Sequence, residues 1–353
     1  MPIPFYHAIA DSPPAHLKHL KALRSFDDFE HDIQALQDAF SPVQAVDAEN
    51  SDITNQGRFC VSFDDGLCEC ATLISAMLRR AGVPAIFFVT PAVLDNKAML
   101  PEHRASLLAE RIIQSGRAPE EQSGGTTERQ DSNDQQTNRP TDQDTRHEAQ
   151  RTKHWEQVLF PPLSTTHDPR STVTPDGFEL ARHIRELPEE KVRELCREYG
   201  VDVDEYLRTE QPYLTSDQVR SLIADGFWIG AHSCSHRNFA ALSRDEQLQE
   251  TRESVNFLKE KFGLDYGLFA FPFLRVPEDP RYWEEMKKSG EVDLFFGQHG
   301  LPVDRKAPFI PRISMEGENA TKPIKQILKE ERDKARRRKR KLWKRRLRGL
   351  LPF

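Results

Sequence analysis

The sequence has few cysteines and no long apolar run. Its five cysteines show no CxxC spacing, so neither a disulfide framework nor a cysteine-rich zinc module is expected. No stretch approaches the roughly 20 apolar residues that span a bilayer. The first residues also lack the basic start and apolar stretch of a secretory signal. These absences favour a cytoplasmic protein with reduced thiols.

Apolar residues are also scarce, at 37% of the 353 residues, so part of the chain is not expected to form a core. The shortage is greatest in residues 118–151, which contain no Val, Ile, Leu, Met, Phe, Tyr or Trp. Such a segment has almost nothing to bury against the entropy cost of ordering it. We therefore predict that residues 118–151 are disordered.

Outside this segment, short apolar strands alternate with amphipathic helices. Helices are predicted over 69–80 and after the capping boxes that begin at Thr215 and Ser243. This alternation is typical of an α/β fold with a largely parallel sheet, in which the chemistry lies at the carboxyl ends of the strands. The predicted strands cover residues 58–63, 85–89, 227–231, 268–271, 294–296 and 310–313.

Acidic residues and histidines follow two of these strands. Asp64 and Asp65 lie in the sequence SFDDG. His232 and His236 lie in HSCSH, where a spacing of four can bring both imidazoles to one face of a helical turn. Two imidazoles and one carboxylate form a three-ligand set with an open position, as in catalytic zinc sites, and the second carboxylate can act as a base. Each motif alone is a weak signal, but together they indicate metal-assisted hydrolysis.

The two motifs resemble signatures of the polysaccharide deacetylase (NodB-homology) family, of the bacterial exopolysaccharide or surface-glycan type. SFDDG is similar to the first family motif, usually TFDDG, and HSCSH to the second, usually H-[S/T]-x-x-H. Phe269–Phe273 is similar to the third-motif strand, and the strand at 310–313 fits a late strand of the family. The resemblance covers roughly residues 1–95 and 213–316.

The resemblance implies an α/β fold, a distorted (β/α) barrel with a long insertion. The predicted organisation is a catalytic domain in two parts, 1–95 and 213–318, an insertion at 96–212 and a basic amphipathic tail at 319–353.

The resemblance also implies a role for each residue of the two motifs. Asp65, His232 and His236 would bind a divalent metal, with zinc favoured and cobalt, nickel or manganese as alternatives, and Asp64 would be the general base. The substrate would be an acetylated sugar or glycan precursor in polysaccharide biosynthesis, with N-acetyl favoured over O-acetyl.

The sequence departs from the family pattern in two places. The late Leu-x-His motif that supplies the general acid has no histidine at residues 311–314, and the third-motif arginine is missing, although Arg275 follows. Some family members carry an early Tyr-His instead, which Tyr6-His7 resembles. The hypothesis is that His7 is the general acid. The alternatives are that His7 is only a polar strand-end residue, or that His299 is the acid, which is less favoured.

Several rival interpretations stay open. Cys68, Cys70 or Cys234 could supply a thiolate ligand, although packing is the favoured role for all three. The same scaffold could hydrolyse a non-sugar amide or a cyclic imide. The chain could also be a glycan-binding relative without catalysis.

The charge is unevenly distributed. Residues 325–353 contain 14 Lys and Arg against 3 Asp and Glu, whereas residues 1–324 contain 36 against 53. Trp343, Leu347, Leu350 and Leu351 fall close to one helical face. We predict that this tail binds an anionic membrane surface, which would make the protein peripheral to the membrane. The alternative is a solvated or disordered tail that docks on the protein's own acidic body. Nucleic acid is not favoured, because few aromatic residues interleave with the basic ones.

Overall fold

The computed structural model describes residues 2–42, 57–115, 176–273, 275–302 and 307–350, which fold as two compact units. The first unit comprises Met1–Pro14, Lys21–Leu100 and Val203–Phe353, and the second comprises Ala15–Leu20 and Pro101–Asp202. The disorder predicted for 118–151 lies outside the described residues. The predicted domain bounds at 95 and 213 stay predictions.

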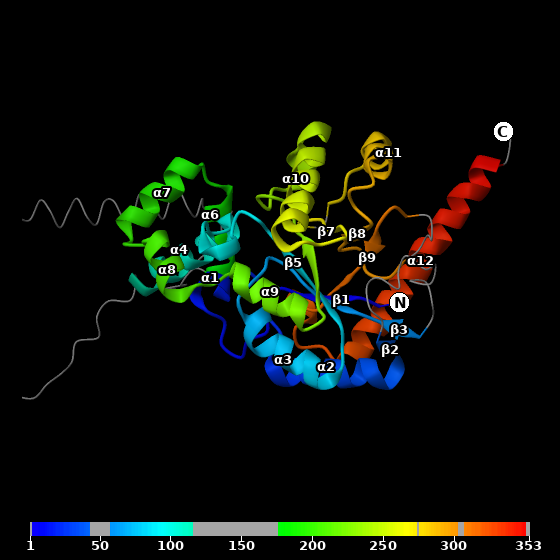
Figure 1. Ribbon diagram of the computed structural model, residues 1–353, viewed down its shortest axis with the longest axis horizontal. Coiled ribbons are helices and arrows are strands. Elements are labelled where there is room, and N and C mark those ends of the chain that lie inside the picture. The colour runs from blue at the N-terminus through cyan, green and yellow to red at the C-terminus, as the bar shows by residue number, and fades with distance from the viewer. Residues whose placement is uncertain (1, 43–56, 116–175, 274, 303–306, 351–353) are drawn as a thin grey trace, which may run out of the picture. The chain divides into compact units, whose positions relative to one another are not determined.

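A nearly closed parallel barrel forms the centre of the first unit (Figure 1). Its strand order is β10-β1-β4-β5-β6-β7-β8-β9, and every neighbouring pair is parallel. The strands are β1 (Pro4–Tyr6), β4 (Val61–Phe63), β5 (Ala85–Val89), β6 (Trp228–Ala231), β7 (Leu268–Ala270), β8 (Leu294–Gly297), β9 (Ile310–Pro311) and β10 (Ile313–Ser314). The predicted distorted (β/α) barrel is thus confirmed.

The two edges of the sheet are joined by one segment that changes partners at Arg312. Before this residue the segment pairs with β8 as β9, and after it the segment pairs with β1 as β10. The N–H of Arg312 donates to the Gly297 carbonyl (2.7 Å), and the next N–H, from Ile313, donates to the Ile3 carbonyl (2.8 Å). The single strand predicted over 310–313 is therefore interrupted, because its hydrogen bonds pass from one sheet edge to the other.

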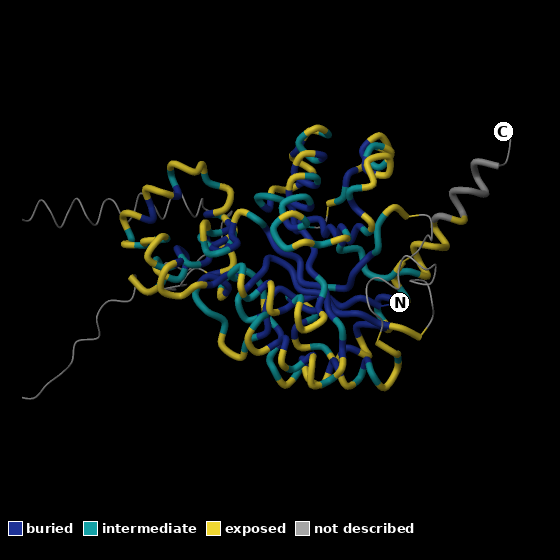
Figure 2. Tube along the Cα trace, viewed as in Figure 1, coloured by how far each residue is buried: buried dark blue, intermediate teal, exposed yellow. Residues whose placement is uncertain are grey.

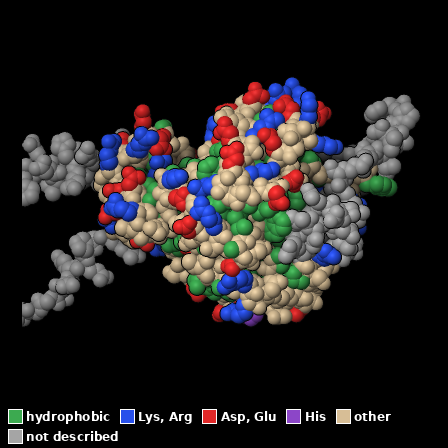
Figure 3. Space-filling view, in the orientation of Figure 1, with side chains coloured by type: hydrophobic (Ala, Val, Ile, Leu, Met, Phe, Trp, Pro, Cys, Tyr) green, Lys and Arg blue, Asp and Glu red, His purple; other side chains and the backbone are tan. Residues whose placement is uncertain are grey.

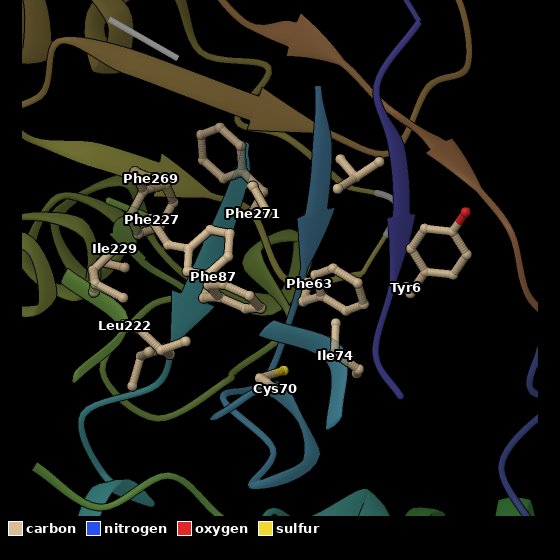
Figure 4. Close-up of a cluster of buried hydrophobic side chains, with 14 of the residues drawn as sticks. Tyr6, Phe63, Cys70, Ile74, Phe87, Leu222, Phe227, Ile229, Phe269 and Phe271 are labelled. Carbon is tan, nitrogen blue, oxygen red and sulfur yellow. The ribbon is translucent and has the colours of Figure 1, made fainter. Parts of the chain in front are cut away.

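The outer face of the barrel packs aromatic side chains in register. Tyr6, Phe63 and Phe87 lie opposite one another on β1, β4 and β5, and their rings stack with centroids 5.3 Å apart (Figure 4). The strands are accordingly buried (Figure 2). The inner face is a separate, smaller cluster of Ile3, Cys60, Ile86, Phe88, Leu268, Ala270 and Phe296.

The alternation of side chains along the strands determines where the candidate site residues point. Tyr6, Phe63 and Ala231 end their strands and belong to the outer cluster. The residues directly after them therefore face the barrel interior, and these are His7, Asp64 and His232.

Helices cover the outer face. Both predicted capping boxes are present, at the starts of α9 (Ser216–Ala224) and α10 (Arg244–Phe262), and a left-handed Gly263 ends α10. Two predicted elements differ from the structure in their details. The helix predicted over 69–80 begins as a π-helical turn, Cys70–Ile74, before α3 (Ser75–Ala81). The strand predicted over 58–63 is divided, because β3 (Arg58–Phe59) pairs with β2 (Ser41–Pro42) in a separate small sheet.

The remaining helices of the first unit are α2 (Phe26–Ala39), α8 (Val203–Glu210), α11 (Pro280–Ser289) and α12 (Ile324–Leu350). The second unit contains α1 (Ala15–Lys18), α4 (Pro101–Ser115), α6 (Gly177–Glu186) and α7 (Glu189–Glu198) around its own apolar core. None of the described helices is long and apolar enough to cross a bilayer. All five cysteines are free thiols.

Gly230 makes room for Phe88 inside the barrel, since a Cβ at residue 230 would lie 2.5 Å from Phe88 Cε1. We predict that Gly230→Ala lowers the free energy of unfolding by about 1–3 kcal/mol through overpacking, as measured by urea denaturation. In a Phe88→Leu background the same substitution should cost less, because the clashing ring is gone. An equal cost in both backgrounds would contradict this packing argument.

Candidate active site

The chain turns sharply where β4 ends. Asp65 and Gly66 both adopt left-handed backbone conformations, with φ of 68° and 71°. At Gly66 a Cβ would also lie 3.2 Å from Val89 Cγ1, so the final glycine of SFDDG is required both by its conformation and by close packing. After this turn the two neighbouring carboxylates have different partners.

Asp65 lies with both predicted histidines. Its Oδ1 is 3.2 Å from His236 Nε2 and 3.5 Å from His232 Nε2, and all three residues are buried. A tetrahedral zinc ion with bonds of about 2.0–2.2 Å needs ligand atoms about 3.3–3.5 Å apart. The structure thus brings the predicted ligand set together, at separations that fit a small divalent cation.

The protonation of His232 also suits a ligand. Its Nδ1 lies 2.8 Å from the Ala270 carbonyl, which fixes Nδ1 as the N–H donor and leaves a lone pair on Nε2. Among the described residues, Nε2 has no hydrogen-bond partner. Burial, together with the nearby His236, lowers the pKa of His232 to about 4, although Asp64 and Asp65 oppose this. The imidazole is therefore neutral at pH 7, the form that binds metals.

The two histidines do not lie on a helical turn, so that prediction was wrong. Residues 232–236 form a bend in which Ser233 and His236 are left-handed. The buried Glu250 of α10 holds this bend, because its Oε2 accepts the N–H groups of Cys234 (2.9 Å) and Ser235 (3.1 Å). The carboxylate of Glu250 thus replaces the hydrogen bonds that a helical turn would make. The two sequence motifs alone do not indicate this contact.

The cysteines near the motifs are poor ligands. Burial, reinforced by neighbouring carboxylates, raises the pKa of Cys68 and Cys234 to about 12 and that of Cys70 well above its usual value. None of these thiols belongs to the group of described residues whose ligand atoms lie within 4.8 Å of one another, so packing remains their favoured role.

Asp64 is bound by Arg312. Two parallel hydrogen bonds, of 2.6 and 2.8 Å, join the guanidinium to the carboxylate, and both side chains are fully buried. Burial raises the pKa of Asp64, but the charge of Arg312 outweighs burial and holds the pKa below its usual value. Asp64 Oδ2 lies 3.9 Å from His232 Nε2, so an ionised carboxylate stands beside the ligand set without belonging to it.

The sequence does not reveal the position of Arg312, because residues 310–313 only fit a late strand of the family and lack its histidine. The guanidinium lies between the rings of Phe5 and Phe88, at 4.7 and 4.9 Å from their centroids, and also donates to Ser62 Oγ (3.1 Å). Arg275, which follows the third motif, is exposed. The only signal for Arg312 was a charged residue inside an otherwise apolar strand.

His7 lies at the same end of the barrel. Its Nε2 is 3.9 Å from Asp65 Oδ2, and its Nδ1 is 2.7 Å from Oε2 of the buried Glu316. Lys21 Nζ lies 3.1 Å from the same oxygen. Burial alone would raise the Glu316 pKa, but the charges of Lys21 and His7 lower it to about 2. Sequence reasoning missed both Glu316 and Lys21. His299 packs against Phe309, with ring centroids 5.1 Å apart, and is not part of the ligand set.

A comparison with known protein families gives a match over part of the chain. The sequence model for the polysaccharide deacetylase family matches residues 187–290, which include both histidines but neither aspartate. No curated protein matches the sequence significantly.

Solved structures share the fold at low identity. The Streptococcus pyogenes deacetylase PplD, in complex with acetate, is 11% identical with a TM-score of 0.52, over 93% of this chain and 97% of that one. IcaB from Ammonifex degensii is 14% identical with a TM-score of 0.50, over 93% and 96%.

Removing Arg312 would leave the Asp64 carboxylate buried without its cation. We predict that Arg312→Met lowers the free energy of unfolding by about 3–5 kcal/mol at pH 7, as measured by urea denaturation. The folded pKa of Asp64 is depressed, so this contribution is fully present above its unfolded pKa of about 4 and declines as the pH falls through the lower folded value.

The half-exposed pair of Arg79 and Asp225 provides the control. Arg79→Met should cost less than about 1 kcal/mol. Equal losses for the two variants, or an Arg312→Met loss that persists unchanged at low pH, would contradict the assignment.

Proposed function

We propose that this chain is a polysaccharide deacetylase, which removes an acetyl group from a sugar with the help of a divalent metal. One observation carries the proposal. An ionised carboxylate, Asp64, lies beside a buried set of one carboxylate and two imidazoles and is bound to an arginine instead of joining the set. This arrangement separates a general base from the residues that hold a cation.

Asp65, His232 and His236 would hold the metal, with zinc favoured by their donor types and spacing. When bound there, the metal would polarise the acyl carbonyl and lower the pKa of a bound water. The hydrogen bond to the Ala270 carbonyl keeps one imidazole oriented toward the cation.

Asp64 would take the proton of the attacking water. Arg312 occupies one lone pair on each carboxylate oxygen, and each oxygen keeps another with which to accept a proton. Because the ion pair also fixes the orientation of the carboxylate, the base does not have to be ordered during the reaction. The depressed pKa keeps Asp64 ionised throughout the neutral range.

His7 would donate the proton to the leaving group. Glu316 accepts from Nδ1, so Nε2 is the ring atom that lies toward Asp65 and can carry the transferred proton. An amine leaves an amide only when it is protonated, so a dedicated acid favours an N-acetyl over an O-acetyl substrate.

Acetate release from a panel of acetylated oligosaccharides, with small amides and cyclic imides as comparison substrates and with zinc or cobalt added, tests the proposed substrate class. Release from the glycans alone would support it. Turnover of only the small amides or imides would favour a different hydrolase on this scaffold. Glycan binding without any acetate release would indicate a non-catalytic relative.

Substitutions of the two aspartates should have different effects on activity and on zinc content. We predict that Asp64→Asn lowers kcat for acetate release by about 10²–10⁴-fold while the bound zinc per chain stays unchanged, because only the base is lost. Asp65→Asn should lose both activity and zinc, which elemental analysis of the purified protein measures. The assignment would be wrong if Asp64→Asn lost zinc while Asp65→Asn kept it.

The acid role gives a separate test. We predict that His7→Ala lowers kcat by about 10²-fold or more, with unchanged zinc content in the folded protein. Glu316→Gln should lower kcat by less, since the imidazole remains but loses its anionic partner. The exposed His31 supplies a control, His31→Ala, that should keep full activity. Near-normal turnover by folded, metal-loaded His7→Ala would rule the acid role out.

A further inference from the structure

The buried residues of helix α12 lie in its first two turns. Ile324, Ile327 and Leu328 are buried against the core, as is Glu331. The segment just before the helix is bound by the buried Arg24, which donates to the backbone carbonyls of Asn319, Ala320 and Lys322. The start of the helix is therefore fixed, and its direction does not depend on its later residues.

The second half of α12 is a continuation of the same helix with a very different surface. The basic residues Arg336–Lys341 are all exposed (Figure 2), and Trp343 is 63% exposed. Residues 332–350 contain 12 Lys and Arg residues and a single acidic residue, Asp333, which gives this segment a formal charge of +11. Such a dense charge of one sign attracts partners of the opposite sign.

The body does not provide this partner in the part of the chain that the structure describes. Within the basic run, Arg336 forms an ion pair with Asp333 of the same helix. Arg338 donates to the backbone carbonyl of His299. On the face of the protein seen in Figure 3, acidic and basic side chains are intermixed. The alternative of a tail docked on the acidic body is thus disfavoured.

We propose that the second half of α12 binds the surface of an anionic lipid bilayer. The basic run would be attracted to anionic headgroups, and the attraction would add up over many exposed side chains. Positions 343, 347 and 350 share one side of a helix by their spacing, and tryptophan favours the boundary between headgroups and acyl chains. A nucleic acid would match the charge but would leave this apolar edge without a use.

The proposal does not depend on the deacetylase reaction, because no residue of α12 belongs to the candidate active site. Membrane binding and acetate release can therefore fail separately. If both hold, the bilayer would keep the barrel close to glycan precursors attached to lipids.

Co-sedimentation of the full chain with vesicles tests the proposal. Vesicles of phosphatidylcholine mixed with phosphatidylglycerol should bind the protein at least about tenfold more tightly than phosphatidylcholine alone, and added salt should weaken the binding. A triple variant, Lys339→Gln, Arg340→Gln and Lys341→Gln, should reduce binding to the mixed vesicles by about tenfold or more. Trp343→Ala should reduce it further by removing the apolar contact.

The matched control removes three exposed charges from α11 with Arg281→Gln, Lys287→Gln and Lys288→Gln, and should bind like the unmodified protein. Acetate release should be the same for both triple variants. Equal binding by the two triple variants would overturn the proposal, as would equal binding to both kinds of vesicle. Binding to duplex DNA without binding to the mixed vesicles would also overturn it and would assign the helix to nucleic acid.

Discussion

The buried ion pair between Arg312 and Asp64 connects the closure of the barrel to its chemistry. Arg312 is the residue at which one segment stops pairing with β8 and starts pairing with β1, so its backbone joins the two sheet edges. Its side chain faces inward and fixes the carboxylate beside the candidate metal site. A buried charge pair adds little net stability over an apolar core, so its value here lies in orientation.

Backbone strain is concentrated around the same site. Seven non-glycine residues have positive φ in the part of the chain that the structure describes, and four of them, Asp65, Ser233, His236 and Phe273, belong to the site or lie against it. The Phe273 ring packs on His236 with centroids 4.9 Å apart. Such conformations cost about 1–3 kcal/mol each and persist only where surrounding contacts hold them. Glu250 provides those contacts for the bend at 232–236. The fold therefore holds the proposed ligand set in place through its own contacts.

The elements with local signals could be predicted from the sequence. Apolar strands, the capping boxes at Thr215 and Ser243 and the two motifs at strand ends placed Asp64, Asp65, His232 and His236 correctly at one end of a barrel. The partners of these residues could not be predicted, because they come from distant segments with no motif of their own. Arg312 contacts Asp64, which lies 248 residues earlier in the sequence, and Glu316 contacts His7, which lies 309 residues earlier. Only the closure of the barrel brings these residues together. For the same reason the bend held by Glu250 was mistaken for a helical turn.

Anomalous diffraction from crystals of the protein grown with zinc would show whether these residues bind a cation. We expect a single strong site per barrel, contacted by Asp65, His232 and His236, with the Asp64 carboxylate still paired to Arg312. A zinc ion bound by Asp64 with Arg312 displaced would contradict it, as would the absence of zinc from these residues.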